Sequence, residues 1–321
     1  MVNDGFSPSP SSENLTASIQ PESLSLLYLG YMRSSLPKQL LACTCISIFG
    51  WYAPTYLVRP VIGMTMKAIP YQVLDNGEVI LDQTLNYPAI DSANVTFPSG
   101  LLVHSNVTFP LFLMATIAIF RPRVQPKYHD VHSALCMTLT SIGMTEFYTN
   151  MLKYYVGRLR PNFYALCQFN ITTLECAADQ SHIFEARSSF PSGHSSLSFC
   201  GMGCLVWFFL GRSGIGKVSN KCSYGEEKGA KRPFYERQWT DNKFGIVAAF
   251  LPWMYASFVA SSRLVDNWHH PSDILAGTLI GIFCSTLSYH LWYPNIFSPN
   301  AGLPLSWLVQ NNSVEYENIQ D

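Results

Sequence analysis

The chain has 321 residues, of which only 13% are charged, and its formal net charge at pH 7 is −1. Apolar residues make up 48% of the sequence and gather in long blocks. This distribution is typical of a protein that spans a membrane several times, and no basic patch indicates nucleic-acid binding.

The first 37 residues are polar and rich in Ser and Pro. They lack the basic start, short apolar core and small-residue cleavage site of a signal peptide. We therefore expect a polar cytoplasmic tail over residues 1–37, followed by a first span that remains as an uncleaved anchor.

Six stretches are long and apolar enough to cross a hydrocarbon core about 30 Å thick, which takes roughly 17–25 helical residues. They lie at residues 39–57, 101–120, 131–152, 195–211, 244–261 and 274–292. Only the third contains a charged residue, Glu146, which we expect to be buried inside the bundle, with a part in a site as the alternative. The sequence thus predicts an all-α membrane protein with a six-span domain over 38–293 and a short cytoplasmic, solvated tail over 294–321.

Basic residues indicate the orientation, because positively charged loops tend to stay in the cytoplasm. The residues before the first span (Arg33 and Lys38) and the loops at 121–130 and 212–243 together carry thirteen Lys and Arg residues, and the opposite side carries seven. We therefore expect both termini in the cytoplasm. The loops on the luminal or extracellular side would be 58–100, 153–194 and 262–273. Whether the membrane is the plasma membrane or an endomembrane stays open.

Cys167 and Cys176 are the only cysteines in the expected external loops. In an oxidising compartment they can form a disulfide, with two free thiols as the alternative. The other cysteines lack the paired spacing of a zinc site, so we expect no metal. Asn94 and Asn170 each begin a glycan acceptor tripeptide on the same side, whereas the tripeptide at Asn106 falls inside the predicted second span.

Two polar clusters lie at the expected external ends of the spans. In the first, Lys153 and Arg160 are seven residues apart, which places both cations on one face of a helix. In the second, Ser192, Gly193 and His194 directly precede an apolar helix, whose unpaired first amides favour an anion. Ser192 offers a hydroxyl, Gly193 a close backbone approach and His194 a proton near neutral pH. Taken alone, the cations could simply extend toward water, and Ser and Gly could simply cap the helix.

A third cluster lies where the last span begins. Arg263 can bind a phosphate with its planar guanidinium, and His269 and Asp273 are one helical turn apart. Asp273 can hydrogen-bond one imidazole nitrogen and leave the other free for nucleophilic attack. Alone, Asp273 could instead balance the helix dipole. All three clusters share one membrane face, and together they supply charge neutralisation, a nucleophile and a proton donor for phosphoryl transfer.

The motifs K-x6-RP, PSGH and SR-x5-H-x3-D, in this order, resemble the type 2 phosphatidic acid phosphatase superfamily. The stretches GRLRP, SFPSGHSS and HHPSDILAG are most similar to its lipid phosphate phosphatase branch. The resemblance implies that His194 is the leaving-group acid, His269 the nucleophile and Asp273 its orienting partner. It selects His269 where chemistry alone leaves His269 and His270 open. The phosphate ligands that it implies are Lys153, Arg160, Ser192, Gly193 and Arg263.

The resemblance further implies metal-independent, cofactor-free hydrolysis of phosphatidate and related lipid phosphates or pyrophosphates, such as diacylglycerol pyrophosphate, through a phosphohistidine. The stretch PYQVLDNG at 70–77 resembles fungal, plant and protist members that act on these two lipids. The alternatives are a polyprenyl-pyrophosphate or sugar-phosphate phosphatase with the same pocket, and a catalytically inactive lipid-binding relative. A vanadium haloperoxidase shares the motifs but is soluble, which six spans argue against. The expected partners are the lipid substrate and the bilayer, and a homo-oligomer stays open.

Overall fold

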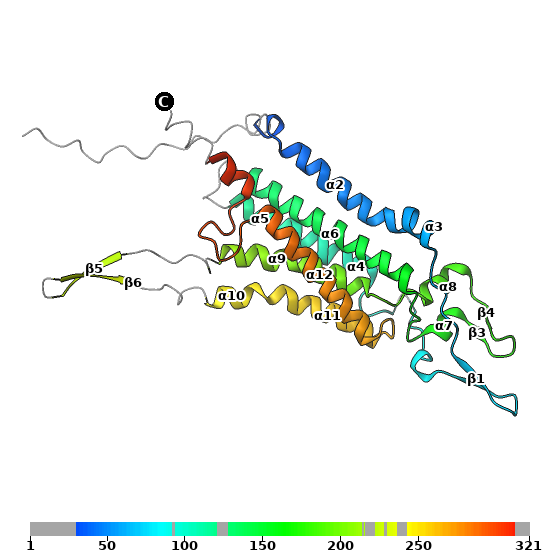
Figure 1. Cartoon of the computed structure of the whole chain (residues 1–321). Helices are drawn as coiled ribbons and strands as arrows, with labels where there is room; N and C mark the ends of the chain where they lie inside the picture. The colour runs from blue at the N-terminus through cyan, green and yellow to red at the C-terminus, as the bar shows by residue number, and fades with distance from the viewer. Residues whose placement is uncertain are drawn as a thin grey trace, which may run out of the picture.

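The computed structural model describes residues 30–91, 94–120, 128–213, 215, 222–227, 230–235 and 243–311. Long helices run side by side as a bundle, and short helices and hairpins gather at one end of it (Figure 1). We call this end, which carries α7 and α8, the site end, and the other the far end. The predicted all-α class is confirmed, because the described strands form only two-stranded sheets beside the helices.

Five stretches of helix within the described residues are long and apolar enough to cross a membrane. They are Leu36–Ile62, Ser99–Phe120, Gly193–Arg212, Lys243–Val265 and Pro271–Trp292. Each contains one of the predicted spans and extends it by a few residues. Their elements are α2 (Leu36–Ala53), η1 (Pro54–Val58) and α3 (Arg59–Ile62); α4 (Ser99–Val103), η3 (His104–Thr108) and α5 (Phe109–Phe120); α9 (Gly193–Arg212); α10 (Lys243–Ala249) and α11 (Leu251–Val265); and α12 (Pro271–Trp292).

The number of six spans is not confirmed, because the predicted third span falls within a helix that is too polar to count among these five. This helix, α6 (Tyr128–Val156), is long enough at 29 residues, but Ser, Thr and ionisable residues lower its hydropathy. Many of its polar side chains are buried, because α6 packs against α2, α9 and α12. Glu146 is one of them, and its Oε2 accepts a hydrogen bond from Asn150 at 3.0 Å.

Helix α9 forms the centre of the bundle, where it packs against α6, α11 and α12. The close approach of α12 depends on two glycines. A Cβ atom on Gly277 would overlap the carbonyl oxygen of Ser192, and one on Gly281 would overlap that of Ser196. Glycine at these positions therefore lets the start of α12 lie against the start of α9, which brings together the residues that precede the two helices.

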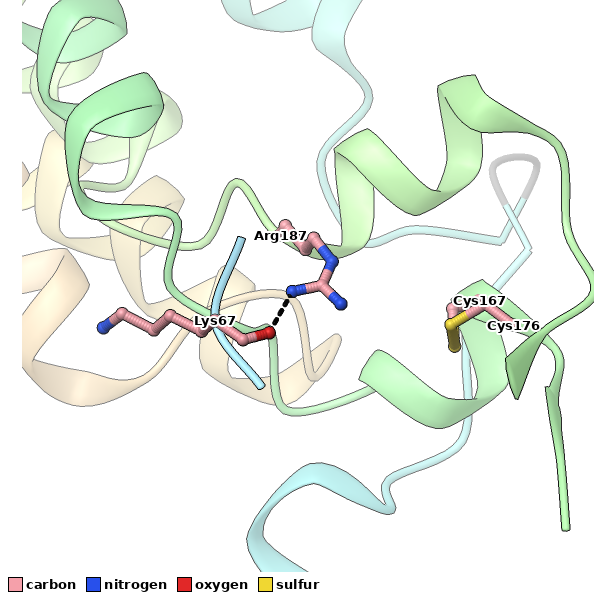
Figure 2. Close-up of a disulfide and its surroundings, with 4 residues drawn as sticks. All are labelled: Lys67, Cys167, Cys176 and Arg187. Atoms are coloured by element: carbon pink, nitrogen blue, oxygen red, sulfur yellow. Dashed lines mark hydrogen bonds between the residues drawn. A yellow bond between two sulfur atoms is a disulfide. The ribbon is translucent and has the colours of Figure 1, made fainter. Parts of the chain in front are cut away.

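The site end is built from segments that connect the spans. After α3 come the antiparallel strands β1 (Tyr71–Val73) and β2 (Val79–Leu81) and the short helix η2 (Gln83–Leu85). Between α6 and α9 lie α7 (Phe163–Cys167), β3 (Phe169–Asn170), β4 (Glu175–Cys176) and α8 (Gln180–Ala186). A disulfide joins Cys167 to Cys176, and Nη1 of Arg187 donates to the carbonyl oxygen of Lys67 at 2.6 Å (Figure 2). The Arg187 bond ties the segment after α8 to the segment after α3.

Part of the expected solvated tail at 294–321 instead packs on the far end. Ile296 contacts the core, Ala301 is buried, and the two imidazole nitrogens of His129 bond to Ser306 and Gln310 at 3.0 and 2.7 Å. The segment packs instead of being solvated because it carries apolar side chains, such as Ile296, that contact the core. The hairpin of β5 (Cys222–Glu227) and β6 (Ala230–Tyr235) extends from the same end (Figure 1).

Much of the sequence that carries the orientation argument lies outside the described residues. This holds for residues 1–29 and 312–321 of the two expected tails, for residues 121–127 of the basic loop at 121–130 and for half of 212–243.

Candidate active site

The three polar clusters meet around one cavity of about 510 Å³ at the site end. Lys153 comes from the last turn of α6, His194 from the first turn of α9 and Arg263 from the last turn of α11. His269 lies in the short connection between α11 and α12. The residues that line the cavity are Val95, Phe97, Pro98, Ser99, Lys153, Arg160, Glu185, Gly193, His194, Arg263, Trp268 and His269.

His269 is held by a backbone carbonyl. Its ring is 4% exposed, and Nδ1 lies 2.7 Å from the carbonyl oxygen of Ser189. A carbonyl oxygen can only accept, so Nδ1 carries the proton and Nε2 keeps its lone pair. Burial lowers the pKa of His269 to about 4, so the imidazole is neutral near pH 7. A neutral imidazole with one fixed tautomer is the form required of a nucleophile.

The expected hydrogen bond between His269 as donor and Asp273 as acceptor is not formed. Oδ2 of Asp273 lies 3.9 Å from Nδ1 of His269, beyond hydrogen-bonding distance. Asp273 occupies the third position of α12, where its side chain turns back and accepts from the backbone N–H of His270 at 2.9 Å. The same Oδ2 accepts from the Ser189 hydroxyl at 2.6 Å. Asp273 is therefore hydrogen-bonded to Ser189, whose carbonyl holds the ring, and lies near His269 without hydrogen-bonding it.

Arg158 completes this network and was not singled out from the sequence. Its Nη1 donates to Oδ1 of Asp273 and to the hydroxyl of Ser272, both at 2.6 Å. The Asp273 side chain is fully buried, whereas that of Arg158 is 33% exposed. Arg158 thus supplies the positive partner of a buried carboxylate from the rim of the site. Its position two residues before Arg160 in the GRLRP stretch was the one available sequence signal.

His194 faces the cavity with an unpaired nitrogen. Its Nε2 is buried and has no hydrogen-bond partner among the described residues. His194 lines the same cavity as Phe97. Its unpaired Nε2 is therefore free to hydrogen-bond a group bound there.

The three cations lie around the same cavity, two of them beside carboxylates. A Cβ atom on Gly193 would lie 3.2 Å from Nζ of Lys153, so the missing side chain leaves room for the ammonium group at the start of α9. Arg160 donates to Oε1 and to the backbone oxygen of Glu185, both at 2.7 Å, and lies over the ring of Trp268. These positive charges and the first amides of α9 make the cavity suited to an anion.

Ser192 has a different place from the one its motif suggested. It is the N-cap of α9, where its hydroxyl accepts from the backbone N–H of Ser195 at 3.4 Å. It is buried and is not among the residues that line the cavity. Ser192 thus shapes the start of the helix, while Gly193 borders the cavity itself.

Several lining residues carry no motif and were missed at the sequence level. Val95, Phe97, Pro98 and Ser99 come from the segment just before and at the start of α4, and Glu185 comes from α8. Val95–Ser99 lie far along the chain from the three motifs, and Glu185 lies close to one of them but belongs to none, so the sequence did not indicate these contacts.

The predicted glycan acceptors and the possibility of a metal site can also be compared with the structure. Asn94 and Asn170 are both exposed at the site end, so their modification stays a prediction. Asn106 is fully buried in η3. Among the described residues, no three His, Cys, Asp or Glu side chains are grouped so that they could hold a metal ion.

Comparison with known proteins gives one family. The model of the PAP2 superfamily matches residues 134–297. A PA-phosphatase related-family protein of Dictyostelium discoideum is 30% identical over 203 residues, which cover 61% of this chain and 65% of the relative. A probable lipid phosphate phosphatase 4 of Arabidopsis thaliana is 31% identical over 213 residues, covering 61% and 62%. In both cases the match spans less than two thirds of the relative's own length.

A relative named for a particular lipid is also similar over most of the chain. Diacylglycerol pyrophosphate phosphatase 1 of Saccharomyces cerevisiae is 28% identical over 248 residues, covering 74% of this chain and 77% of the relative. No solved structure matches the chain.

Proposed function

The chain belongs to the PAP2 superfamily, and on this premise we propose that it is an integral-membrane phosphatase that releases phosphate from lipid phosphates through a phosphohistidine. The observation that carries the proposal is the neutral, buried His269, whose Nδ1 is fixed by Ser189 and whose ring borders a cavity lined by three cations. The names of its relatives, lipid phosphate phosphatase and diacylglycerol pyrophosphate phosphatase, support the same class.

In the first step, the lone pair on Nε2 of His269 attacks the phosphorus atom of the lipid phosphate. A bond from Nε2 to phosphorus forms, and the bond from phosphorus to the lipid oxygen breaks. The leaving oxygen takes a proton from His194, so that the lipid alcohol departs neutral. The Ser189 carbonyl stabilises the positive charge on His269 through Nδ1–H, and Asp273 holds Ser189 in position.

In the second step, water attacks the phosphohistidine. His194, now neutral, takes a proton from the water as its oxygen bonds to phosphorus and the bond to Nε2 breaks. Inorganic phosphate leaves, His269 returns to its neutral form and His194 is again protonated. The same imidazole thus acts as acid in one direction and as base in the other.

Lys153, Arg160 and Arg263 neutralise the three outer oxygens of the transferring phosphoryl group in this proposal, together with the amides at the start of α9. Gly193 lets the phosphate approach these amides, and Ser192 acts as their cap. With this much positive charge from the chain, the reaction proceeds without a divalent cation.

The proposed substrates are phosphatidate and diacylglycerol pyrophosphate. They are supported by the PYQVLDNG stretch at 70–77 and by the name of the Saccharomyces relative. Polyprenyl pyrophosphates and sugar phosphates are the alternatives, because they present the same phosphate group to the cavity. We further propose that the site end faces the lumen or the cell exterior, as the distribution of Lys and Arg indicates.

The proposal is tested with purified protein, excess chelator and a panel of phosphatidate, diacylglycerol pyrophosphate, a polyprenyl pyrophosphate and a sugar phosphate. The released inorganic phosphate is measured. We expect release from the first two lipids at the highest kcat/KM, with no effect of the chelator. No release from any member of the panel, or release only with added magnesium, would overturn the proposal.

A further inference from the structure

One stretch of the cavity wall differs from the rest in its chemistry. Val95–Ser99 contributes three apolar side chains and one hydroxyl to the lining, whereas the remaining lining carries all the charged side chains. The family match begins at residue 134, so this stretch comes from outside the matched region. The charged lining suits the phosphate, which leaves Val95–Ser99 to contact the uncharged part of the substrate.

This wall is fixed to the phosphate-binding side through a buried carboxylate. Asp266 is 2% exposed, and its Oδ2 lies 2.7 Å from Nη2 of Arg263. The other partner of Asp266 is Thr96, which donates its hydroxyl to Oδ1 at 2.7 Å and its backbone N–H to Oδ2 at 3.0 Å. One carboxylate therefore links a proposed phosphate ligand to the middle of the wall.

Phe97, the next residue of the wall, is held by packing. Phe97 is buried in a core cluster with Leu102 and Val259, and its ring meets that of Tyr255 edge-on, with the centroids 6.3 Å apart. Phe97 also lines the same cavity as His194. The wall thus borders the cavity together with the proposed acid and is linked, through Asp266, to the proposed phosphate ligand Arg263.

We propose that Val95–Ser99 is the specificity-determining wall of the cavity, which contacts the lipid group attached to the phosphate, and that Asp266 is a positioning residue that holds this wall against Arg263. The inference rests on the proposed function and adds the element that selects the substrate. A change in the contact between Thr96 and Asp266 then alters the recognition of the lipid and leaves the recognition of phosphate unchanged.

The test uses Thr96→Val, which removes the hydroxyl, and Thr96→Ser, which keeps it. Because Thr96 also completes the glycan acceptor at Asn94, the control is Asn94→Gln, which removes the acceptor and leaves Thr96 in place. Each variant is assayed for kcat and KM with phosphatidate, and for inhibition by vanadate, which resembles phosphate and carries no lipid.

We expect Thr96→Val to raise KM for phosphatidate at least fivefold and to leave the vanadate inhibition constant within twofold. Thr96→Ser and Asn94→Gln should match the wild type in both. Asp266→Asn, which disturbs Arg263 as well, should raise both constants. A Thr96→Val protein that loses only kcat, changes both constants equally or changes neither would overturn the inference. Wild-type protein without phosphatase activity would instead overturn the proposed function.

Discussion

Asp273 and His269 are not hydrogen-bonded to each other: the carboxylate lies 3.9 Å from Nδ1, and the Ser189 carbonyl accepts from that nitrogen instead at 2.7 Å. The position of the proposed nucleophile therefore depends on a backbone atom. Asp273 contributes to the position of His269 indirectly, because it accepts a hydrogen bond from the Ser189 hydroxyl. Arg158, at the outer end of this network, becomes a residue with a testable role.

Arg158→Ala should lower kcat about tenfold and leave KM for phosphatidate nearly unchanged. The variant removes a charge-assisted hydrogen bond from a fully buried carboxylate, an effect of roughly 1.5–3 kcal/mol that the partial exposure of Arg158 reduces. Arg158→Lys keeps the charge and should recover part of the rate. Steady-state kinetics of the three proteins checks this. A rise in KM with unchanged kcat would instead place Arg158 among the substrate ligands.

The acid limb of the pH profile should lie well below pH 6.5. Burial holds the pKa of His269 at about 4 in the folded protein, against 6.5 for an ordinary imidazole. The nucleophile thus remains neutral as the pH falls to 5 and is protonated near pH 4. Between pH 6.5 and 4 the unfolded chain binds a proton that the folded chain lacks, so the contribution of His269 to stability decreases as the pH falls through this window.

Profiles of kcat/KM against pH for phosphatidate and diacylglycerol pyrophosphate check this. A fall in kcat/KM that is caused by titration of the enzyme occurs at the same pH for both substrates, whereas one caused by titration of the substrate differs between them. An enzyme limb near pH 6.5 would contradict the buried, neutral His269.

Gly277→Ala should lower both thermal stability and activity. The new methyl group would overlap the Ser192 carbonyl oxygen, which would push the start of α12 away from the start of α9. Overpacking of this kind costs about 1–3 kcal/mol. Gly245→Ala is the matched control, since its Cβ atom would meet nothing within 4 Å. Thermal unfolding in detergent compares the two, and equal stability would contradict the close packing of α9 and α12.

Replacing Cys167 and Cys176 together by Ser should destabilise the site end. A disulfide that closes a loop of this length contributes about 2–3 kcal/mol in the chain-entropy model. Cys45→Ser is the control, because Cys45 is free and exposed. Limited proteolysis of the two proteins should show faster cleavage between α7 and α8 only in the double variant. Equal cleavage rates would show that the disulfide does not stabilise this segment.

The sequence predicted the parts of the site that sit on regular helices. Lys153, His194 and Arg263 lie in the terminal turns of apolar or amphipathic helices, and short motifs give both their chemistry and their place. The gathering of these helix ends at one end of the bundle followed from the alternation of spans and loops. The five most apolar spans were located to within a few residues, because the length and composition of an apolar stretch are read directly from the sequence.

The parts that escaped prediction depend on contacts between distant segments. The Ser189 carbonyl carries no side-chain signal, yet it takes the hydrogen bond assigned to Asp273. Thr96 meets Asp266 across 170 residues of sequence. Helix α6 buries many Ser and Thr side chains against neighbouring helices, and no local pattern of the sequence records which polar side chains are covered in this way.

The central claim is a phosphohistidine at His269. Purified protein is mixed briefly with phosphatidate labelled in its phosphate, quenched in alkali, digested and mapped for the labelled peptide. We predict label on His269 in the wild type and none in His269→Ala. Label should be retained in His270→Asn, because His270 is the N-cap of α12 and Asn can cap a helix in the same way. Label on His269→Ala, or on any other residue of the wild type, would contradict the account.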